Sequence, residues 1–177
     1  RGYADVYGCE WVEAAPDDDT PQPNLPGAHQ RDNAATAIAC LKTLGLPVHL
    51  DALQHVNWPG RIMDLVGVPD GWRLIYDGAH NVDSARVLGE TLKGQNLTLI
   101  LGMQSGKPVG EFLRAFDPAL ITVQPIDLPV GQHPQSGEAI GTQAKAAGYE
   151  TRLSAPDIET ALARLFATGM PHTAIIT

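Results

Sequence analysis

Cysteine and basic residues are scarce in this sequence, and each shortage excludes a class of protein. The 177 residues include two cysteines, Cys9 and Cys40, which fits a reducing cytosol, and no Cys/His spacing suggests a zinc site. Lysine and arginine number 12 against 20 aspartates and glutamates, for a formal net charge of -8. That balance argues against a nucleic-acid-binding protein, because no excess of positive charge is available to neutralise phosphates. It does not exclude one bound nucleotide, which needs only a local site.

Long apolar runs are also missing. No run approaches the roughly 20 residues that span a bilayer, and no signal peptide is present, so we expect a cytoplasmic protein without a membrane partner. Hydrophobic residues make up 44% and charged residues 18% of the sequence, which indicates a globular chain.

The ends of the sequence suggest a piece of a longer chain. It begins with Arg1 instead of Met and stops at Thr177 on an apolar run. We therefore expect residues 1–46 to be the remnant of a preceding domain, 47–57 a linker, and 58–177 a second domain that is truncated at its end.

From residue 58 onward, apolar segments of strand length alternate with helical patterns. Residues 97–103 are almost continuously apolar, as in a parallel strand buried on both faces. The alternation predicts an α/β fold, a Rossmann-like and mostly parallel sheet with helices on both faces. The expected strands cover 62–66, 73–77, 97–103, 120–125, 149–153 and 173–177, and the expected helices cover 81–93, 109–116, 136–147 and 157–168. Before them we expect a loop over 1–26, a helix over 28–44 and a short helix over 51–54.

Ligands of open α/β sheets bind beyond the carboxyl ends of the strands, which draws attention to the segment Asp77-Gly78-Ala79-His80-Asn81. A carboxylate there can accept hydrogen bonds from ribose hydroxyls, and a nearby imidazole can contact a phosphate or a carboxylate. The simpler interpretation is that Asp77 and Asn81 brace a turn and that His80 is a surface residue.

The segments after two other predicted strands contain polar residues that the sequence pattern assigns to structural roles and not to a site. The segment 102–107 resembles a P-loop, but its glycines enclose only three residues and Pro108 follows Lys107 where a hydroxyl should hold magnesium. Asp127, His133 and Ser136 could suggest a hydrolase triad, yet Ser136 stands where a helix N-cap is expected.

Upstream, Asn33 lies near the start of a predicted helix, where an amide could read an adenine edge. Arg61 follows a rigid Trp58-Pro59-Gly60 turn, and its guanidinium suits phosphate oxygens or stacking on a base. Each of these residues alone could equally be a structural brace or a surface side chain.

Taken together, these segments resemble a known family. G-A-H-Q-x-x-N-A-A at 27–35, W-P-G-R at 58–61 and D-G-A-H-N at 77–81 occur in this order in folylpolyglutamate synthase/dihydrofolate synthase, of the Mur ligase superfamily. The resemblance implies an ATP-dependent ligase that joins L-glutamate to dihydropteroate or a folate through an acyl phosphate, with Mg2+. It also implies a Mur-type C-terminal domain, here preceded by the end of the ATPase domain.

The resemblance assigns roles to four residues. Asn33 would contact adenine, Arg61 and Asp77 would contact the nucleotide, with Asp77 at the ribose, and His80 would lie near the incoming glutamate or the phosphates. No metal ligand is expected within this sequence, because the family's P-loop, magnesium ligands and carbamylated lysine lie upstream.

The sequence also departs from the family. Gly106-Lys107-Pro108 replaces an Asp-Lys-Asp, His133 stands where relatives often carry arginine, and the usual Gly-Ser would follow Thr177. We therefore expect this part of the chain to be inactive alone and to need the ATPase domain of the same chain, as a monomer. The alternatives are a peptidoglycan Mur ligase C-terminal domain, which the first two motifs disfavour, and a non-catalytic Rossmann-like nucleotide-binding module.

Overall fold

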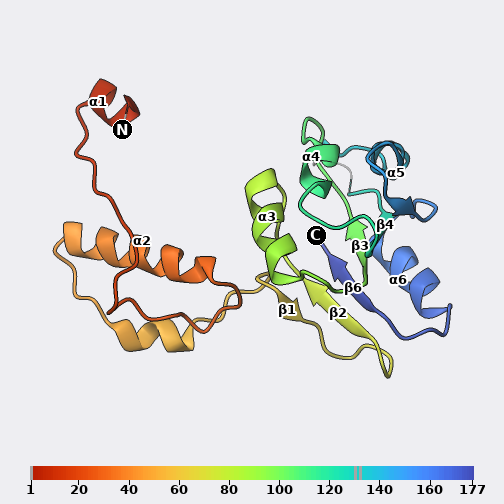
Figure 1. Ribbon diagram of the computed structural model, residues 1–177, viewed down its shortest axis with the longest axis horizontal. Helices are drawn as coiled ribbons and strands as arrows, with labels where there is room; N and C mark the ends of the chain where they lie inside the picture. The colour runs from red at the N-terminus through yellow and green to blue at the C-terminus, as the bar shows by residue number, and fades with distance from the viewer. Residues whose placement is uncertain (1, 130, 132) are drawn as a thin grey trace. The chain divides into compact units, whose positions relative to one another are not determined.

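The computed structural model describes residues 2–129, 131 and 133–177, and the chain divides into two compact units, Arg1–Trp58 and Pro59–Thr177. Figure 1 shows the elements of each, with most of the helices and strands labelled. Within the described residues, no helix is both long enough and apolar enough to cross a bilayer.

The first unit is built on one long helix. Helix α2 covers His29–Thr43. Gly45 follows its C-cap, and its φ of 66° suits the left-handed turn that terminates many helices. A 3-10 helix, η1, covers Leu50–His55 where a short helix over 51–54 is predicted. The loop predicted over 1–26 is wrong at its start, because α1 forms over Gly2–Tyr7. Its helical hydrogen bonding is local, and Gly8 (φ 63°) ends it.

Hydrogen bonds fold the segment before α2 back onto the helix and onto η1. The Arg31 side chain donates from Nε to the carbonyl of Thr20 at 2.9 Å and also to the carbonyl of Asp17. The amide of Gln54 donates to the carbonyl of Gln22 at 3.0 Å. Polar contacts therefore hold this unit together, and the buried residues of α2 are only Gln30, Ala34 and Ala35.

The second unit is a six-stranded sheet in the order β1-β2-β6-β3-β4-β5, with β1 antiparallel to β2 and all other neighbours parallel. The strands are β1 (Met63–Asp64), β2 (Arg73–Tyr76), β3 (Leu97–Leu101), β4 (Ile121–Pro125), β5 (Glu150–Thr151) and β6 (Thr173–Ile176). The helices are α3 (Val82–Thr91), α4 (Val109–Leu113), α5 (Gly137–Ala146) and α6 (Ile158–Phe166). The predicted fold class is confirmed.

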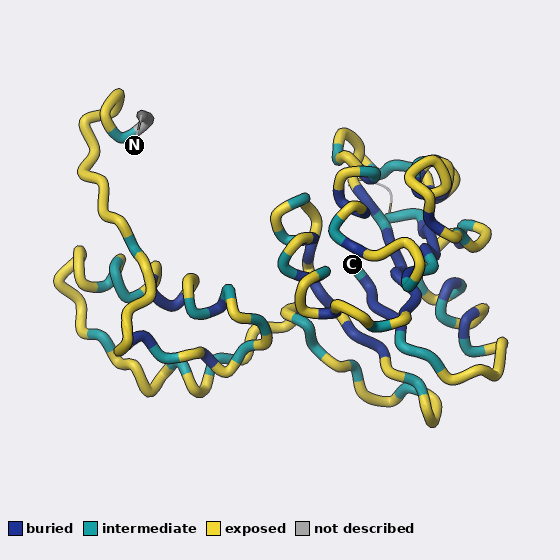
Figure 2. The backbone as a smooth tube through the Cα atoms, viewed as in Figure 1, coloured by how far each residue is buried: buried dark blue, intermediate teal, exposed yellow. Residues whose placement is uncertain are grey.

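The sheet separates two hydrophobic clusters. One contains Leu99 of β3 with residues of α3, α4 and α5, and the other contains Ile100 of β3 with residues of α6. Adjacent residues of a strand point to opposite faces, so α6 covers one face and the other three helices cover the opposite one. Figure 2 shows the buried backbone concentrated in these strands. The change of face follows from right-handed crossovers, since α6 returns the chain from the edge strand β5 to the middle of the sheet.

Tyr149 follows the C-terminal end of α5 and hydrogen-bonds the C-terminal end of α4 and the segment after it. Its buried hydroxyl donates toward the carbonyls of Leu113 and Phe116, and burial raises the pKa of the phenol. We predict that Tyr149→Phe lowers the free energy of unfolding by about 1–2 kcal/mol, because buried acceptors lose their donor. Urea denaturation followed by circular dichroism measures this difference, and an unchanged midpoint would show that the hydroxyl contributes nothing.

His172 gives the second unit a pH dependence. Its ring packs edge-on against Trp72 with centroids 6.5 Å apart. Burial, and next the positive charge of Arg152, lower the pKa of His172 below its ordinary 6.5. The unfolded chain therefore binds this proton more readily, so the stability contribution is complete above pH 6.5 and is lost as pH falls through that value and then through the lower folded pKa.

We expect His172→Asn to flatten the fall in unfolding free energy between about pH 7 and pH 5. Urea midpoints measured across this range test it. An equally steep fall in the variant would assign the pH dependence to other groups.

Candidate functional site

The carboxyl ends of β2, β6, β3 and β4 are consecutive along one edge of the sheet. The loops that follow β2, β3 and β4 therefore share this edge. Thr177, directly after β6, joins its neighbours: its hydroxyl donates to the carbonyl of Ala79, and its carbonyl accepts from the N–H of Gly102 at 3.3 Å. The sequence-predicted candidate loops thus do lie side by side.

Asp77 is buried at this edge, with 7% of its surface exposed. One carboxylate oxygen accepts from the N–H of Ala79 at 2.9 Å, within the same turn. The other oxygen accepts from the N–H of Ile62, also at 2.9 Å, in a segment 15 residues earlier. Both oxygens are therefore engaged by backbone donors, which is the bracing role that the sequence left open.

The segments W-P-G-R and D-G-A-H-N interlock through these contacts. The N–H of Gly78 donates to the carbonyl of Gly60 at 2.9 Å, beside the bond from Ile62 to Asp77. Gly60 has a φ of 77°, and a Cβ built there would lie 3.1 Å from the ring of Tyr76, so glycine suits this position on both counts. Arg61 is exposed at the corner that the interlock creates.

His80 is exposed beside this corner. Its Nδ1 lies 2.9 Å from the carbonyl of Gly78, which requires a proton on Nδ1 and leaves Nε2 as the outward nitrogen. The hydroxyl of Ser84 accepts from the N–H groups of His80 and Asn81, each at 3.1 Å. Asn81 and Ser84 form a capping box at the start of α3.

Asn33 belongs to the first unit. It is exposed on the first turns of α2, and its amide nitrogen donates to the side-chain oxygen of the buried Gln30 at 3.0 Å. The hydrogen bond fixes the orientation of the Asn33 amide on the helix. Its participation in a site with Arg61, Asp77 and His80 stays a prediction.

Sequence reasoning missed the residue that joins the loops after β3 and β4. The amide of Gln135 donates to the carbonyls of Gln104 and Lys107 at 3.1 and 2.9 Å and accepts from Gln143 at 2.8 Å. Ser84 was also missed, although its place three residues after Asn81 is the ordinary signal of a capping box. Nothing in a single sequence marks Gln135 in this way.

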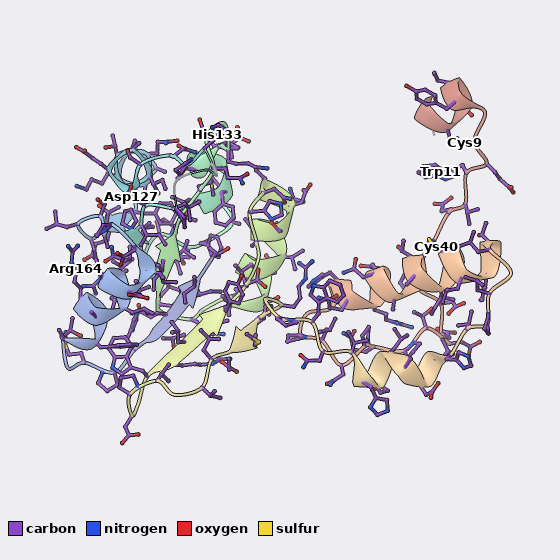
Figure 3. All side chains as sticks on the ribbon, turned by 180° about the vertical axis from the view of Figure 1, so that it is seen from behind. Cys9, Trp11, Cys40, Asp127, His133 and Arg164 are labelled. Carbon is purple, nitrogen blue, oxygen red and sulfur yellow. The ribbon has the colours of Figure 1, made fainter. Side chains whose placement is uncertain are left out.

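The remaining members of the loop after β4 have structural roles. The carboxylate of Asp127 accepts from the N–H of Gly137 at 2.6 Å, and the hydroxyl of Ser136 accepts from the N–H of Ala139 at 3.2 Å. His133 is exposed in the same loop, and its carbonyl accepts from the N–H of Ser105 at 2.7 Å. Figure 3 labels Asp127 and His133 in this region. Asp127 and Ser136 both accept hydrogen bonds from the start of α5, which is the structural role that the sequence favours for Ser136.

A hollow of about 480 Å³ lies elsewhere, between α5, the segment after β5 and Arg164 of α6. It is at the β5 side of the sheet, three strands away from β6. Within the described part of the chain, no group of three or more acidic, histidine or cysteine side chains could hold a metal ion.

Comparisons with known proteins bear on this arrangement. No family model matches the sequence. Over 94 residues it is 31% identical to a probable dihydrofolate synthetase of Schizosaccharomyces pombe, a match that covers 49% of this chain and 22% of that protein. The ligand-free bifunctional folylpolyglutamate synthase/dihydrofolate synthase of Yersinia pestis superposes with a TM-score of 0.68 and 26% identity, over 90% of this chain and 38% of that one.

The chain resembles the folylpolyglutamate synthase/dihydrofolate synthases. The family resemblance predicted from the three motifs is confirmed. A further folylpolyglutamate synthase/dihydrofolate synthase, solved with Mn, AMPPNP and L-glutamate bound, superposes with a TM-score of 0.67 and 25% identity over 89% of this chain and 37% of that one. The chain therefore spans well under half the length of these synthases.

Proposed function

We propose that this chain supplies part of the ATP and L-glutamate site of a folate-pathway ligase, which adds L-glutamate to dihydropteroate, to folyl(poly)glutamate, or to both. One observation carries the proposal. Arg61 and His80 project from a single interlocked corner at the carboxyl edge of the sheet, in a fold shared with a synthase solved with AMPPNP and L-glutamate.

The proposed reaction has two steps. A carboxylate oxygen of the pterin substrate attacks the γ-phosphorus of ATP, which forms an acyl phosphate and releases ADP. The amine of L-glutamate then attacks the acyl carbon, phosphate leaves with the bonding electrons, and the amine loses a proton as the amide forms. An acyl phosphate hydrolyses readily, so a site closed between two domains protects it from water.

The residues of this chain would bind and orient the reactants. The Arg61 guanidinium suits the phosphate oxygens, and Nε2 of His80 is oriented outward, toward the phosphates or the incoming glutamate. The Asn33 amide can donate to and accept from an adenine edge. Mg2+ would neutralise phosphate charge, but the described residues do not form a cluster suited to it, so we place its ligands in the ATPase domain of the same chain.

An assay of the full-length protein tests the proposal. We expect ADP release that depends on both L-glutamate and either dihydropteroate or a reduced folate, and none from residues 1–177 alone. ADP release with a muramoyl-peptide precursor instead would support a peptidoglycan ligase. Nucleotide binding without turnover on any of these acids would leave the non-catalytic module. We also propose a cytoplasmic monomer, and size-exclusion chromatography of the same preparation tests the oligomeric state.

A further inference from the structure

We propose that the hollow of about 480 Å³ at the β5 side of the sheet binds a small polycarboxylate, and that the γ-glutamyl tail of a folylpolyglutamate is the ligand it fits. The choice of this tail rests on the proposed function, whereas the binding of a polycarboxylate does not. The site is separate from the corner that carries Arg61 and His80. That corner follows β2, which lies four strands from β5, or about 19 Å at the usual spacing of neighbouring strands.

The hollow forms where the chain leaves the sheet after the two-residue strand β5. Beyond the strand, the carbonyl of Leu153 accepts from the side-chain amide of Gln124 at 2.9 Å. Arg164 of α6 donates to the carbonyl of Ser154, also at 2.9 Å. These two bonds hold the segment that lines one side of the hollow, and α5 lines another. The walls are therefore built from ordered elements before a ligand binds.

Positive charge is concentrated around this hollow. Three of the chain's 12 lysines and arginines line it, against the single carboxylate of Glu138. Lys145 lies on the last turn of α5, Arg152 follows β5, and Arg164 lies on α6, where Figure 3 labels it. Because α5 and α6 cover opposite faces of the sheet, these cations approach its open edge from both faces. In a chain of net charge -8, such a concentration favours an anionic ligand.

The donors of these side chains are available to a ligand. Among the described residues, the side chains of Lys145 and Arg152 form no hydrogen bond or ion pair. Arg164 gives one hydrogen bond to the carbonyl of Ser154, and a guanidinium has five N–H donors. An anion therefore displaces no carboxylate from these cations when it binds.

The lining favours a polycarboxylate over a compact phosphate. Phosphates in proteins often bind the free N–H groups at a helix N-terminus. At the start of α5, the N–H groups of Gly137 and Ala139 already donate to side chains, and Glu138 adds a negative charge beside them. Leu153 lines the same hollow with 85% of its surface exposed. Carboxylates separated by methylene groups match cations that are separated around an apolar side chain.

A γ-glutamyl chain has this chemistry. Each unit carries one α-carboxylate and two methylene groups in the linkage, so several units present a row of negative charges joined by apolar links. The proposed ligase lengthens such chains, which makes its own product the source of the ligand. Citrate shares the negative charge but not the repeat of carboxylates along a chain.

Isothermal titration of γ-linked tetraglutamate into the full-length protein tests the site. We expect Lys145→Gln and Arg152→Gln each to raise the Kd roughly 3- to 5-fold, and the double variant to raise it at least about 10-fold. Arg114→Gln removes an exposed charge of the same unit away from the hollow, and this matched control should change the Kd less than about 2-fold. Equal increases in all three single variants would overturn the proposal.

A second variant introduces charge without removing a cation. Thr142 is exposed on α5 and lines the hollow, so Thr142→Glu places a second carboxylate there. We expect it to raise the Kd for tetraglutamate roughly 5-fold, although Lys145 and Arg152 remain. An unchanged Kd would mean that tetraglutamate binds elsewhere.

Inorganic phosphate and citrate, titrated in the same way, decide the class of ligand. We expect both to bind at least about 10-fold more weakly than tetraglutamate, because neither places carboxylates along a chain. Phosphate bound as tightly as tetraglutamate, with the same loss in the double variant, would overturn the assignment to a polycarboxylate. Citrate bound as tightly would overturn the assignment to a γ-glutamyl tail.

An activity assay separates this site from the proposed function. Glutamate-dependent ADP release by the double variant Lys145→Gln, Arg152→Gln should match wild type when the acid substrate has no polyglutamate tail, because the hollow lies apart from Arg61 and His80. Failure of the proposed function would appear as wild-type protein that binds tetraglutamate but releases no ADP. Failure of the site would appear as normal ADP release in a protein whose affinity for tetraglutamate does not depend on Lys145 and Arg152.

Discussion

Replacing Gly89 with alanine is expected to lower the free energy of unfolding of the second unit by roughly 2–3 kcal/mol. A Cβ built on Gly89, in α3, would lie 2.1 Å from the carbonyl oxygen of Ala115 and 3.0 Å from its carbonyl carbon. Both are backbone atoms just beyond the end of α4, so no rotamer change can relieve the clash and α3 must move away from this segment. Chemical denaturation followed by circular dichroism measures the loss.

Gly110→Ala is the matched control. Gly110 lies in α4, and a Cβ built there would meet nothing within 4 Å. Alanine restricts the unfolded chain more than glycine does, so this variant should gain about 0.5 kcal/mol. Equal effects of the two substitutions would show that helix propensity, not the approach of α3 to Ala115, determines the outcome at Gly89.

Gly89 also shows where sequence reasoning ends. A glycine inside a helical pattern only lowers helix propensity, and its helix partner is invisible without the fold. The βα alternation predicted the fold class correctly, because local apolar patterns determine which segments are strands. The order of the strands was not predicted, since the insertion of β6 between β2 and β3 depends on contacts between residues about 100 positions apart in the chain.

The bounds of the strands illustrate a second limit of prediction from the sequence. A strand is predicted over 62–66, but only Met63–Asp64 pairs with β2. Ile62 precedes it in a left-handed conformation and Gly67 (φ 77°) turns the chain soon after it. At the opposite edge, a strand predicted over 149–153 pairs only at Glu150–Thr151. There the side-chain amide of the buried Gln124 donates a hydrogen bond to the carbonyl of Leu153 at 2.9 Å. This carbonyl is therefore bonded by a side chain and not by the backbone of β4.

For the candidate site, the motifs predicted which residues belong to it but not which hydrogen bonds those residues make. Arg61, Asp77 and His80 were selected from strand ends and family motifs, and the structure brings them to one corner. That Asp77 serves the N–H of Ile62 could not be predicted, because isoleucine gives no signal of a positive φ. The site depends on a backbone conformation that the sequence disfavours locally and that only tertiary contacts maintain.

On the proposed function, Arg61→Ala is expected to lower kcat/KM for ATP roughly 10- to 100-fold in the full-length protein. The figure follows from a charge-assisted hydrogen bond worth about 1.5–3 kcal/mol, where 1.4 kcal/mol corresponds to a factor of ten. The side chain of Arg61 is exposed, and within the part of the chain that the structure describes it forms no ion pair with an acidic residue. The guanidinium therefore has its donors available for a phosphate without first breaking an ion pair.

Arg61→Lys and Arg114→Ala make this prediction specific. Lysine keeps the charge but not the planar fork of donors, so Arg61→Lys should recover only part of the lost kcat/KM. Arg114, exposed at the end of α4, carries the same charge on the same unit, and its replacement should change kcat/KM less than about 2-fold if long-range charge is unimportant. Equal losses in Arg61→Ala and Arg114→Ala would mean that general attraction between the unit and ATP is being measured. A loss confined to position 61, and deeper for alanine than for lysine, would place the phosphates at the corner that Asp77 holds.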